Sequence, residues 1–160
     1  MKIKAFIISL TLTIISFCES YGQEGNLNDV EYTIIAKGTD SPIPDLQIVC
    51  FNKYFNKDYL PSDFRKKYNL DEKRLYKKKM LVELFHSDTD GKGLDEIELI
   101  GIQENDENLI VNYNVINSDT KNDEEKLSPF LIVQVPKSKK DIKFVVNGSE
   151  LGKGTELYVD

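Results

Sequence analysis

The residues with the clearest potential for chemistry form an acidic segment, SDTDGKGLDEIEL, which begins at Ser87. Asp88, Asp90 and Asp95 offer carboxylate oxygens, the donors that calcium prefers. A calcium loop of the EF-hand type needs an oxygen donor at its fifth position and a bidentate glutamate at its twelfth. Counted from Asp88, those positions hold lysine and leucine. We interpret the segment as an acidic turn, and a weak calcium site through the three aspartates is the alternative.

The glycines of the same segment favour a turn by themselves. Gly-Lys-Gly occupies 91–93 and recurs at 152–154, where no aspartates precede it. Glycine adopts positive φ without steric cost, which suits a chain reversal between strands.

His86 is the only histidine of the chain, and it precedes Ser87 and Asp88. Neighbouring residues on a strand point to opposite faces, so these three cannot form a Ser–His–Asp relay as they stand. A hydrolase would need a carboxylate or serine brought to His86 from elsewhere in the fold. Zinc needs three or four ligands, usually His or Cys, and the chain has one histidine and two cysteines. We therefore expect no catalytic residues, no cofactor and no enzymatic activity.

The first residues of the chain have the layout of a secretory signal peptide. Lys2 and Lys4 precede an apolar run over residues 5–17, and small residues lie before Gln23. The run is shorter than the roughly 20 residues that span a bilayer. The sequence therefore predicts cleavage of residues 1–22 near Gly22-Gln23, a secreted or periplasmic mature chain, and no stable membrane insertion of that chain.

The two cysteines have different expected fates. Cys18 could carry a lipid, but Phe17 is large where a lipoprotein signal has a small residue, which disfavours lipoprotein anchoring. Cys50 lies in the apolar run LQIVCF, with no base nearby to lower its pKa. We expect it to be a small hydrophobic residue of the core.

Charge is distributed unevenly along the chain, whose net charge is −6. Residues 65–79 hold eight basic and two acidic residues, whereas residues 88–125 hold twelve acidic and two basic ones. The net negative charge disfavours nucleic acid as a partner. The basic stretch either steers an acidic partner or is a solvated surface.

Period-two patterns dominate after residue 80 and predict an antiparallel sheet. The expected strands are 31–38, 46–51, 80–86, 94–102 with a bulge near Ile100-Gly101, 108–116, 130–135, 141–146 and 155–159. Asn147-Gly148 predicts a hairpin turn. Leu60, Phe64 and Tyr68 recur every four residues and predict one amphipathic helix, with a second helical turn near 71–76 as a weaker expectation.

The expected fold is α+β: a mainly antiparallel sheet of about five to seven strands with one amphipathic helix packed on it. The expected organisation is a signal peptide over 1–22, a leader with a first strand over 23–45, and a single domain over 46–160.

The segments YKKKMLVELFHSDTDGKGLDEIELIGIQENDENLIVNYNV and LSPFLIVQVPKSKKDIKFV resemble the PrcB-like family of small exported bacterial proteins, named for a subunit that binds and stabilises a surface protease complex. The shared features are a basic lead into an apolar strand, a glycine turn into the next strand, an acidic hairpin, and SPFLIVQVPK before a short apolar strand. The resemblance implies a binding module without an active site of its own. We thus expect a secreted protein that binds or stabilises another envelope or secreted protein, with a protease as one candidate partner. The alternative is a small-ligand or calcium-binding protein that uses the acidic loop at 88–98.

Overall fold

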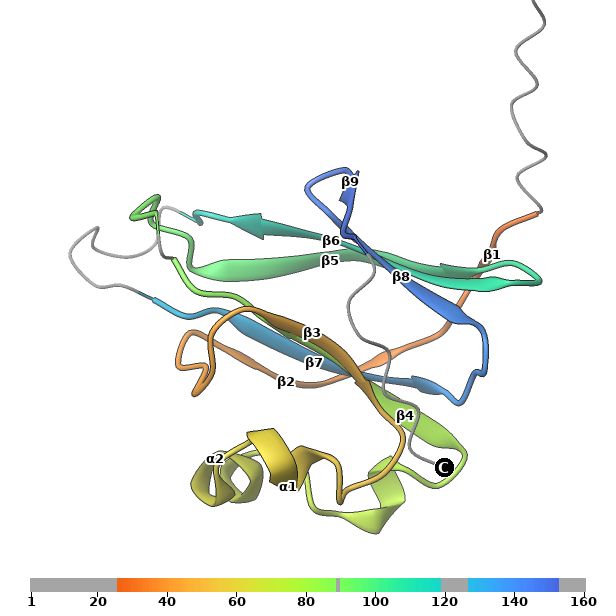
Figure 1. Ribbon diagram of the computed structural model, residues 1–160, viewed down its shortest axis with the longest axis horizontal. Coiled ribbons are helices and arrows are strands. Elements are labelled where there is room, and N and C mark those ends of the chain that lie inside the picture. Colours follow the sequence, from red (N-terminus) through yellow and green to blue (C-terminus); the bar gives the residue numbers. More distant parts are fainter. Residues whose placement is uncertain (1–25, 89, 119–126, 153–160) are drawn as a thin grey trace, which may run out of the picture.

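The computed structural model describes residues 26–88, 90–118 and 127–152, which form three stacked layers (Figure 1). A five-stranded sheet, sheet A, lies on a four-stranded sheet, sheet B, and helical segments cover the other face of sheet B. The predicted signal peptide and Cys18 lie outside the described residues. In chain order the elements are β1 (Asn28–Asp29), β2 (Thr33–Gly38), β3 (Leu46–Cys50), α1 (Asn56–Tyr59), α2 (Ser62–Lys67), the 3-10 helix η1 (Lys73–Leu75), β4 (Lys79–Phe85), β5 (Glu96–Glu104), β6 (Asn108–Ile116), β7 (Phe130–Pro136), β8 (Asp141–Val146) and β9 (Ser149–Glu150).

The sheet-dominated α+β class is confirmed, but the prediction of one sheet of five to seven strands is wrong. The described residues hold nine strands in two sheets, ordered β1-β5-β6-β8-β9 in sheet A and β2-β7-β4-β3 in sheet B. After β6 the chain crosses to sheet B as β7 and then returns, so β8 pairs with β6 in parallel. The other strand pairs are antiparallel.

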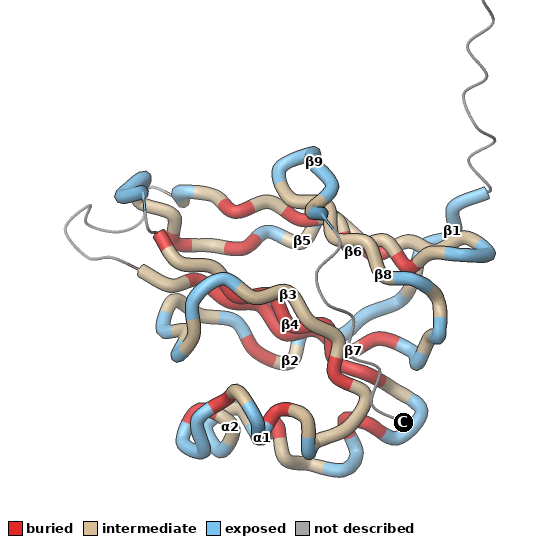
Figure 2. The backbone as a smooth tube through the Cα atoms, in the orientation of Figure 1, coloured by how far each residue is buried: buried red, intermediate tan, exposed pale blue. Residues whose placement is uncertain are grey.

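The two sheets divide because β4 and β7 carry apolar side chains on both faces. Along β4, Val82 and Leu84 point into the core between the sheets, whereas Leu81 and Phe85 point into a second core beneath the helical segments. Figure 2 shows the buried residues concentrated along β4 and β7, in the middle layer. A strand that is apolar on both faces needs cover on both sides, which a single sheet with one helix does not give.

Each outer layer contributes one apolar face. In β6, Leu109, Val111, Tyr113 and Val115 are all buried and pack in the inter-sheet core, as the alternation predicts. On the opposite side of sheet B, the ring of Phe64 lies 5.0 Å from that of Phe130, measured between centroids. Aromatic contacts of Phe64 with Phe130 and Phe85 thus hold the helical segments on sheet B.

The predicted single helix is in fact two short helices. Helix α1 ends at Tyr59, Leu60 is extended at φ −97° and ψ 131°, and α2 begins after Pro61. The proline ring disfavours helical backbone in the residue before it, which explains the break. The predicted apolar stripe survives, since Leu60 and Phe64 are buried. The weaker expectation of a turn near 71–76 is met by η1.

The predicted bulge and the predicted hairpin turn are both confirmed. The register of β5 shifts between Leu99 and Gly101, which is the predicted bulge. Asn147 and Gly148 both have positive φ, 49° and 78°, in the turn between β8 and β9. The strand expected at 155–159 lies outside the described residues, and β1 forms ahead of the first strand that we expected at 31–38. No helix in the described part of the chain is long and apolar enough to cross a membrane.

Candidate functional site

The carboxylate of Asp88 holds the acidic loop closed. Its two oxygens accept hydrogen bonds from the backbone amides of Lys92 and Gly93, both at 2.8 Å, and the residue is 4% exposed. Gly91 and Gly93 have φ of 64° and 70°, as the turn interpretation requires. In this arrangement Asp88 is the internal cap of a turn.

The other two candidate calcium ligands are also engaged. Asp90 is exposed, and its carboxylate lies 2.9 Å from the ammonium of Lys92. Asp95 is buried and accepts hydrogen bonds from the backbone amide and hydroxyl of Ser118, at 2.8 and 2.7 Å. Across residues 26–88, 90–118 and 127–152, no three His, Cys, Asp or Glu side chains gather in a group that could hold a metal ion.

His86 lies in a hydrogen-bonded chain that joins the two sheets. Its Nδ1 atom is 3.0 Å from the Asp45 carboxylate, and its Nε2 atom is 3.0 Å from the Tyr113 hydroxyl. The amide nitrogen of Gln47 is 3.2 Å from the same Nε2 atom. A neutral ring protonated on Nδ1 fits the contacts with Asp45 and Tyr113, because Nδ1 donates to the Asp45 carboxylate and Nε2 accepts from the Tyr113 hydroxyl. Burial lowers the pKa of His86, although the Asp45 carboxylate raises it in part.

The hydrogen bonds of His86 do not include a nucleophile that it could activate. A serine nucleophile is activated by a hydrogen bond to its base. The hydroxyl of Ser87 is buried and has no hydrogen-bond partner in the described part of the chain, so His86 does not activate it. Tyr113, which does contact His86, is fully buried, and burial raises the pKa of its hydroxyl.

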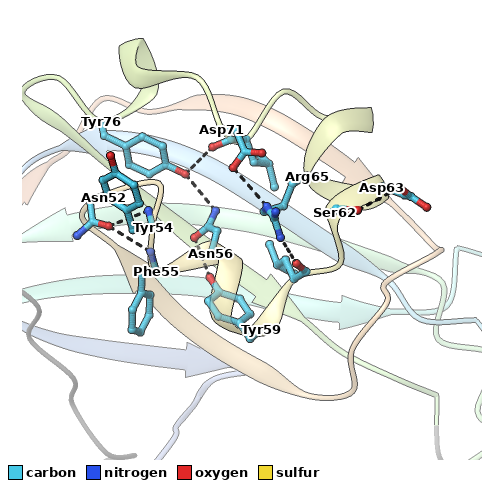
Figure 3. Close-up of polar contacts among 12 residues, drawn as sticks. Asn52, Tyr54, Phe55, Asn56, Tyr59, Ser62, Asp63, Arg65, Asp71 and Tyr76 are labelled. Carbon is cyan, nitrogen blue, oxygen red and sulfur yellow. Dashed lines mark hydrogen bonds and ion pairs between the residues drawn. The ribbon is translucent and has the colours of Figure 1, made fainter.

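A second polar cluster lies beneath α1, in the core between sheet B and the helical segments. Glu83 of β4 is fully buried; it accepts a hydrogen bond from the amide of Asn56 at 2.9 Å, and its other carboxyl oxygen lies 2.8 Å from the Tyr59 hydroxyl. The Asn56 amide also donates to the Tyr76 hydroxyl, as Figure 3 shows, and the Tyr76 hydroxyl donates to the carbonyl of Leu70. We call Cys50, Asn56, Tyr59, Tyr76 and Glu83 the buried network.

Burial is the largest influence on the pKa values of the buried network. Burial raises the pKa of Glu83 to about 7, and hydrogen bonds from Tyr59, Asn56 and Cys50 offset part of that rise. Burial also raises the pKa of the hydroxyls of Tyr59 and Tyr76 and of the Cys50 thiol. The Cys50 sulfur lies 2.7 Å from the Tyr59 hydroxyl, so its core position includes a polar contact that the sequence did not indicate.

Above this network, the helical layer carries an exposed basic surface. Residues 53–79 hold ten basic and four acidic residues, a net charge of +6 in a chain whose net charge is −6. We define the basic surface by its exposed members: Lys57, Lys66, Lys67, Lys73, Arg74, Lys77 and Lys78. Lys67 pairs with Asp40, and Arg74 pairs with Glu72. Among the described residues, no ion pair neutralises Lys66, Lys73, Lys77 or Lys78.

Tyr54 adds a large aromatic group beside this surface. Its side chain is 63% exposed, and the ammonium groups of Lys53 and Lys57 lie 5.3 and 5.4 Å from its ring centroid. Its backbone amide donates to the side chain of Asn52, which fixes the loop that presents it (Figure 3). An exposed aromatic ring with two cations near it is suited to contact a partner that brings apolar area and negative charge.

An open groove lies between the β5–β6 connection and the β7–β8 connection. Its lining mixes acidic and basic side chains, including Glu104 and Lys140, which form an ion pair with each other at 2.9 Å. This mixture selects no ligand charge, so the groove gives no functional assignment.

Comparisons with known proteins found no protein family, curated protein or solved structure that matches this chain. The functional assignment therefore rests on the geometry described above. Sequence reasoning missed Asp45 and Tyr113 as partners of His86, and it missed the buried network. One signal was available for the network: Glu83 is the single charged residue inside the apolar run MLVELF.

Proposed function

We propose that this chain is an exported, non-enzymatic binding module that holds an acidic patch of another envelope or secreted protein against its basic surface. The observation that carries the proposal is the concentration of exposed, unneutralised lysines on the helical layer of a chain with net negative charge. Such a patch attracts a negatively charged partner and orients it before contact.

Charge on the other side of the molecule supports one preferred orientation. Sheet A and its turns carry exposed acidic side chains, among them Glu98, Asp106, Glu107, Asp141 and Glu150. Sheet A and the helical layer lie on opposite sides of sheet B (Figure 1). An acidic partner is thus attracted to the helical layer and repelled from sheet A.

The helical layer is held in place by packing, although its helices are short. Helices of four and six residues are not stable alone, because helix nucleation is costly. Here Phe64 packs against Phe85 and Phe130, and the buried network ties α1 to β4. Preorganised surfaces lose less conformational freedom on binding, which favours affinity.

The class of partner is the least constrained part of the proposal: the sequence resemblance to the PrcB-like family favours a protease complex at the cell surface as one candidate. Within the surface, Tyr54 is the candidate anchor, because exposed aromatic residues dominate binding energy in many interfaces. The lysines around it contribute mainly to the rate of association and to its salt dependence.

The test is capture of partners from an envelope extract by the purified protein, at low and at high salt. The substitutions Lys66→Gln, Lys73→Gln and Lys77→Gln together remove three charges from the basic surface. The matched control removes three charges elsewhere, through Lys92→Gln, Lys137→Gln and Lys139→Gln. We expect wild type and control to recover the same acidic protein at low salt, and the basic-surface variant to lose it. Equal recovery by both triple variants, or no reproducible partner, contradicts the proposal.

A further inference from the structure

Three members of the buried network form a closed ring of hydrogen bonds. The Asn56 amide nitrogen lies 2.9 Å from Glu83 Oε1, Glu83 Oε2 lies 2.8 Å from the Tyr59 hydroxyl, and that hydroxyl lies 3.0 Å from Asn56 Oδ1. Asn56 and Glu83 are both fully buried. Three contacts in a closed ring need three protons, one for each contact.

When Glu83 is ionised, the ring holds only two of the three protons that its contacts need. The Tyr59 hydroxyl has one proton, and both Glu83 Oε2 and Asn56 Oδ1 are acceptors. If Tyr59 donates to the carboxylate, the buried Asn56 oxygen loses its donor, which costs free energy. If Glu83 carries a proton on Oε2, it donates to Tyr59, Tyr59 donates to Asn56, and Asn56 donates to Glu83 Oε1.

The surroundings of Glu83 offer no positive charge that would hold a carboxylate. The ionisable groups that face it are Cys50 from β3, Tyr59 from α1 and Tyr76 after η1. Arg65 and Asp71 act on the neighbouring Tyr76, and these two groups form an ion pair with each other at 3.3 Å. In the part of the chain that the structure describes, no Lys, Arg or His contacts Glu83.

The geometry points to a proton-dependent lock: Glu83 is held as a neutral carboxylic acid that closes the ring with Tyr59 and Asn56, and loss of its proton to solvent weakens the attachment of α1 to sheet B. The lock is independent of the proposed function, because it concerns the attachment of the helical layer and not its partner. Burial without a counter-ion and the count of donors both favour the neutral form.

A direct test follows the side-chain carboxyl carbon of Glu83 by NMR in the purified, glutamate-labelled protein from pH 4 to pH 9. We expect a titration midpoint near the pKa of about 7, with the signal assigned by its absence in Glu83→Gln. A midpoint at or below the ordinary value of 4.5 overturns the inference. If the variant does not fold, the signal is assigned in wild type through its couplings to the backbone of Glu83, so the titration still stands.

A second test measures unfolding by urea at pH 5 and pH 8. Glutamine is the isostere of the neutral acid: its amide can donate to Tyr59 while its oxygen accepts from Asn56. Given a folded-state pKa of about 7 against 4.5, the wild-type unfolding constant should increase between these pH values by roughly 70-fold more than that of Glu83→Gln. Parallel profiles overturn the inference.

The matched control is Glu98→Gln, which removes a carboxylate from the exposed face of sheet A. Its pH profile should follow wild type, whereas a profile like that of Glu83→Gln would show that the effect is one of net charge and would overturn the lock.

Amide hydrogen exchange at pH 8 locates the change. We expect the amides of α1 to exchange faster in wild type than in Glu83→Gln, and equal rates at α1 contradict the proposal.

Discussion

The Nε2 atom of His86 lies 3.0 Å from the hydroxyl oxygen of Tyr113, and this contact joins the end of β4 in sheet B to β6 in sheet A. Tyr113 is fully buried, so the imidazole meets the inter-sheet core on this side and the exposed Asp45 on the other. A ring in this position is stable in its neutral form, since Nε2 can then accept the hydrogen bond from tyrosine.

The His86 contact predicts that the protein loses stability as the pH falls. Because burial lowers the folded-state pKa of His86, its contribution is complete above the ordinary value of 6.5 and is lost as the pH falls through the folded-state pKa. In His86→Gln this loss should be absent, as measured by urea unfolding from pH 7.5 to pH 5. Glu83 changes stability in the opposite direction over this range, but it does so equally in both proteins, so their difference isolates His86.

Tyr113→Phe is the control for the histidine experiment. It removes the hydroxyl but keeps the titrating ring, so the acid sensitivity should persist while stability decreases by about 1 kcal/mol at every pH. Identical pH profiles for wild type and His86→Gln would contradict the assigned role of His86.

Asp88 should be required for stability and not for calcium. Asp88→Ala removes the acceptor of two backbone amides and should lower the free energy of unfolding by about 1–2 kcal/mol. Asp90→Ala is the matched control, because that carboxylate is exposed and its loss should leave the unfolding midpoint unchanged. Millimolar calcium should not shift the midpoint of wild type in thermal unfolding. A calcium-dependent rise in that midpoint that Asp88→Ala abolishes would restore the calcium-site alternative.

Local pattern was sufficient to predict the seven longer strands, because each reflects which faces are buried, but it missed the two-residue strands β1 and β9. The alternation over 108–116 gave the inward residues of β6, and Asn147-Gly148 gave the turn before β9. The apolar runs in β4 and β7 also contained evidence for a second sheet, since a strand with two apolar faces must be covered twice. The spacing of apolar residues does not tell which sheet or helix packs on each face of these strands.

The polar sites could not be predicted from spacing. Asn56 and Glu83 are 27 positions apart, and His86 meets Asp45 only because β3 and β4 pair in antiparallel register with Leu46 opposite Phe85. Such contacts depend on which strands become neighbours, a property of the whole chain. Pro61 shows the converse case: the break between α1 and α2 follows from a local rule that the apolar stripe alone does not include.

The Cys50 thiol should be inert in the folded protein. It is fully buried, and burial raises its pKa well above the ordinary value, so little thiolate forms near neutral pH. In the Cys18→Ser variant, Ellman's reagent should therefore modify Cys50 only at the rate at which the protein unfolds, and immediately in strong denaturant. Fast modification under native conditions would show that the cover over the buried network opens easily.

The last prediction concerns two glycines in strands, only one of which is confined. A Cβ atom at Gly38 would lie 2.8 Å from Cε1 of Phe130 and 3.0 Å from Oδ1 of Asp40, whereas a Cβ at Gly101 would meet no atom within 4 Å. Gly38→Ala must displace the ring of Phe130, which packs against Phe64 in the helical layer, and should cost about 1–3 kcal/mol of unfolding free energy. Gly101→Ala should be neutral or slightly stabilising, because the unfolded chain loses freedom and nothing is displaced. Equal unfolding midpoints for the two variants in urea would mean that Phe130 can move without loss, and that the aromatic contacts between sheet B and the helices are looser than the ring distances indicate.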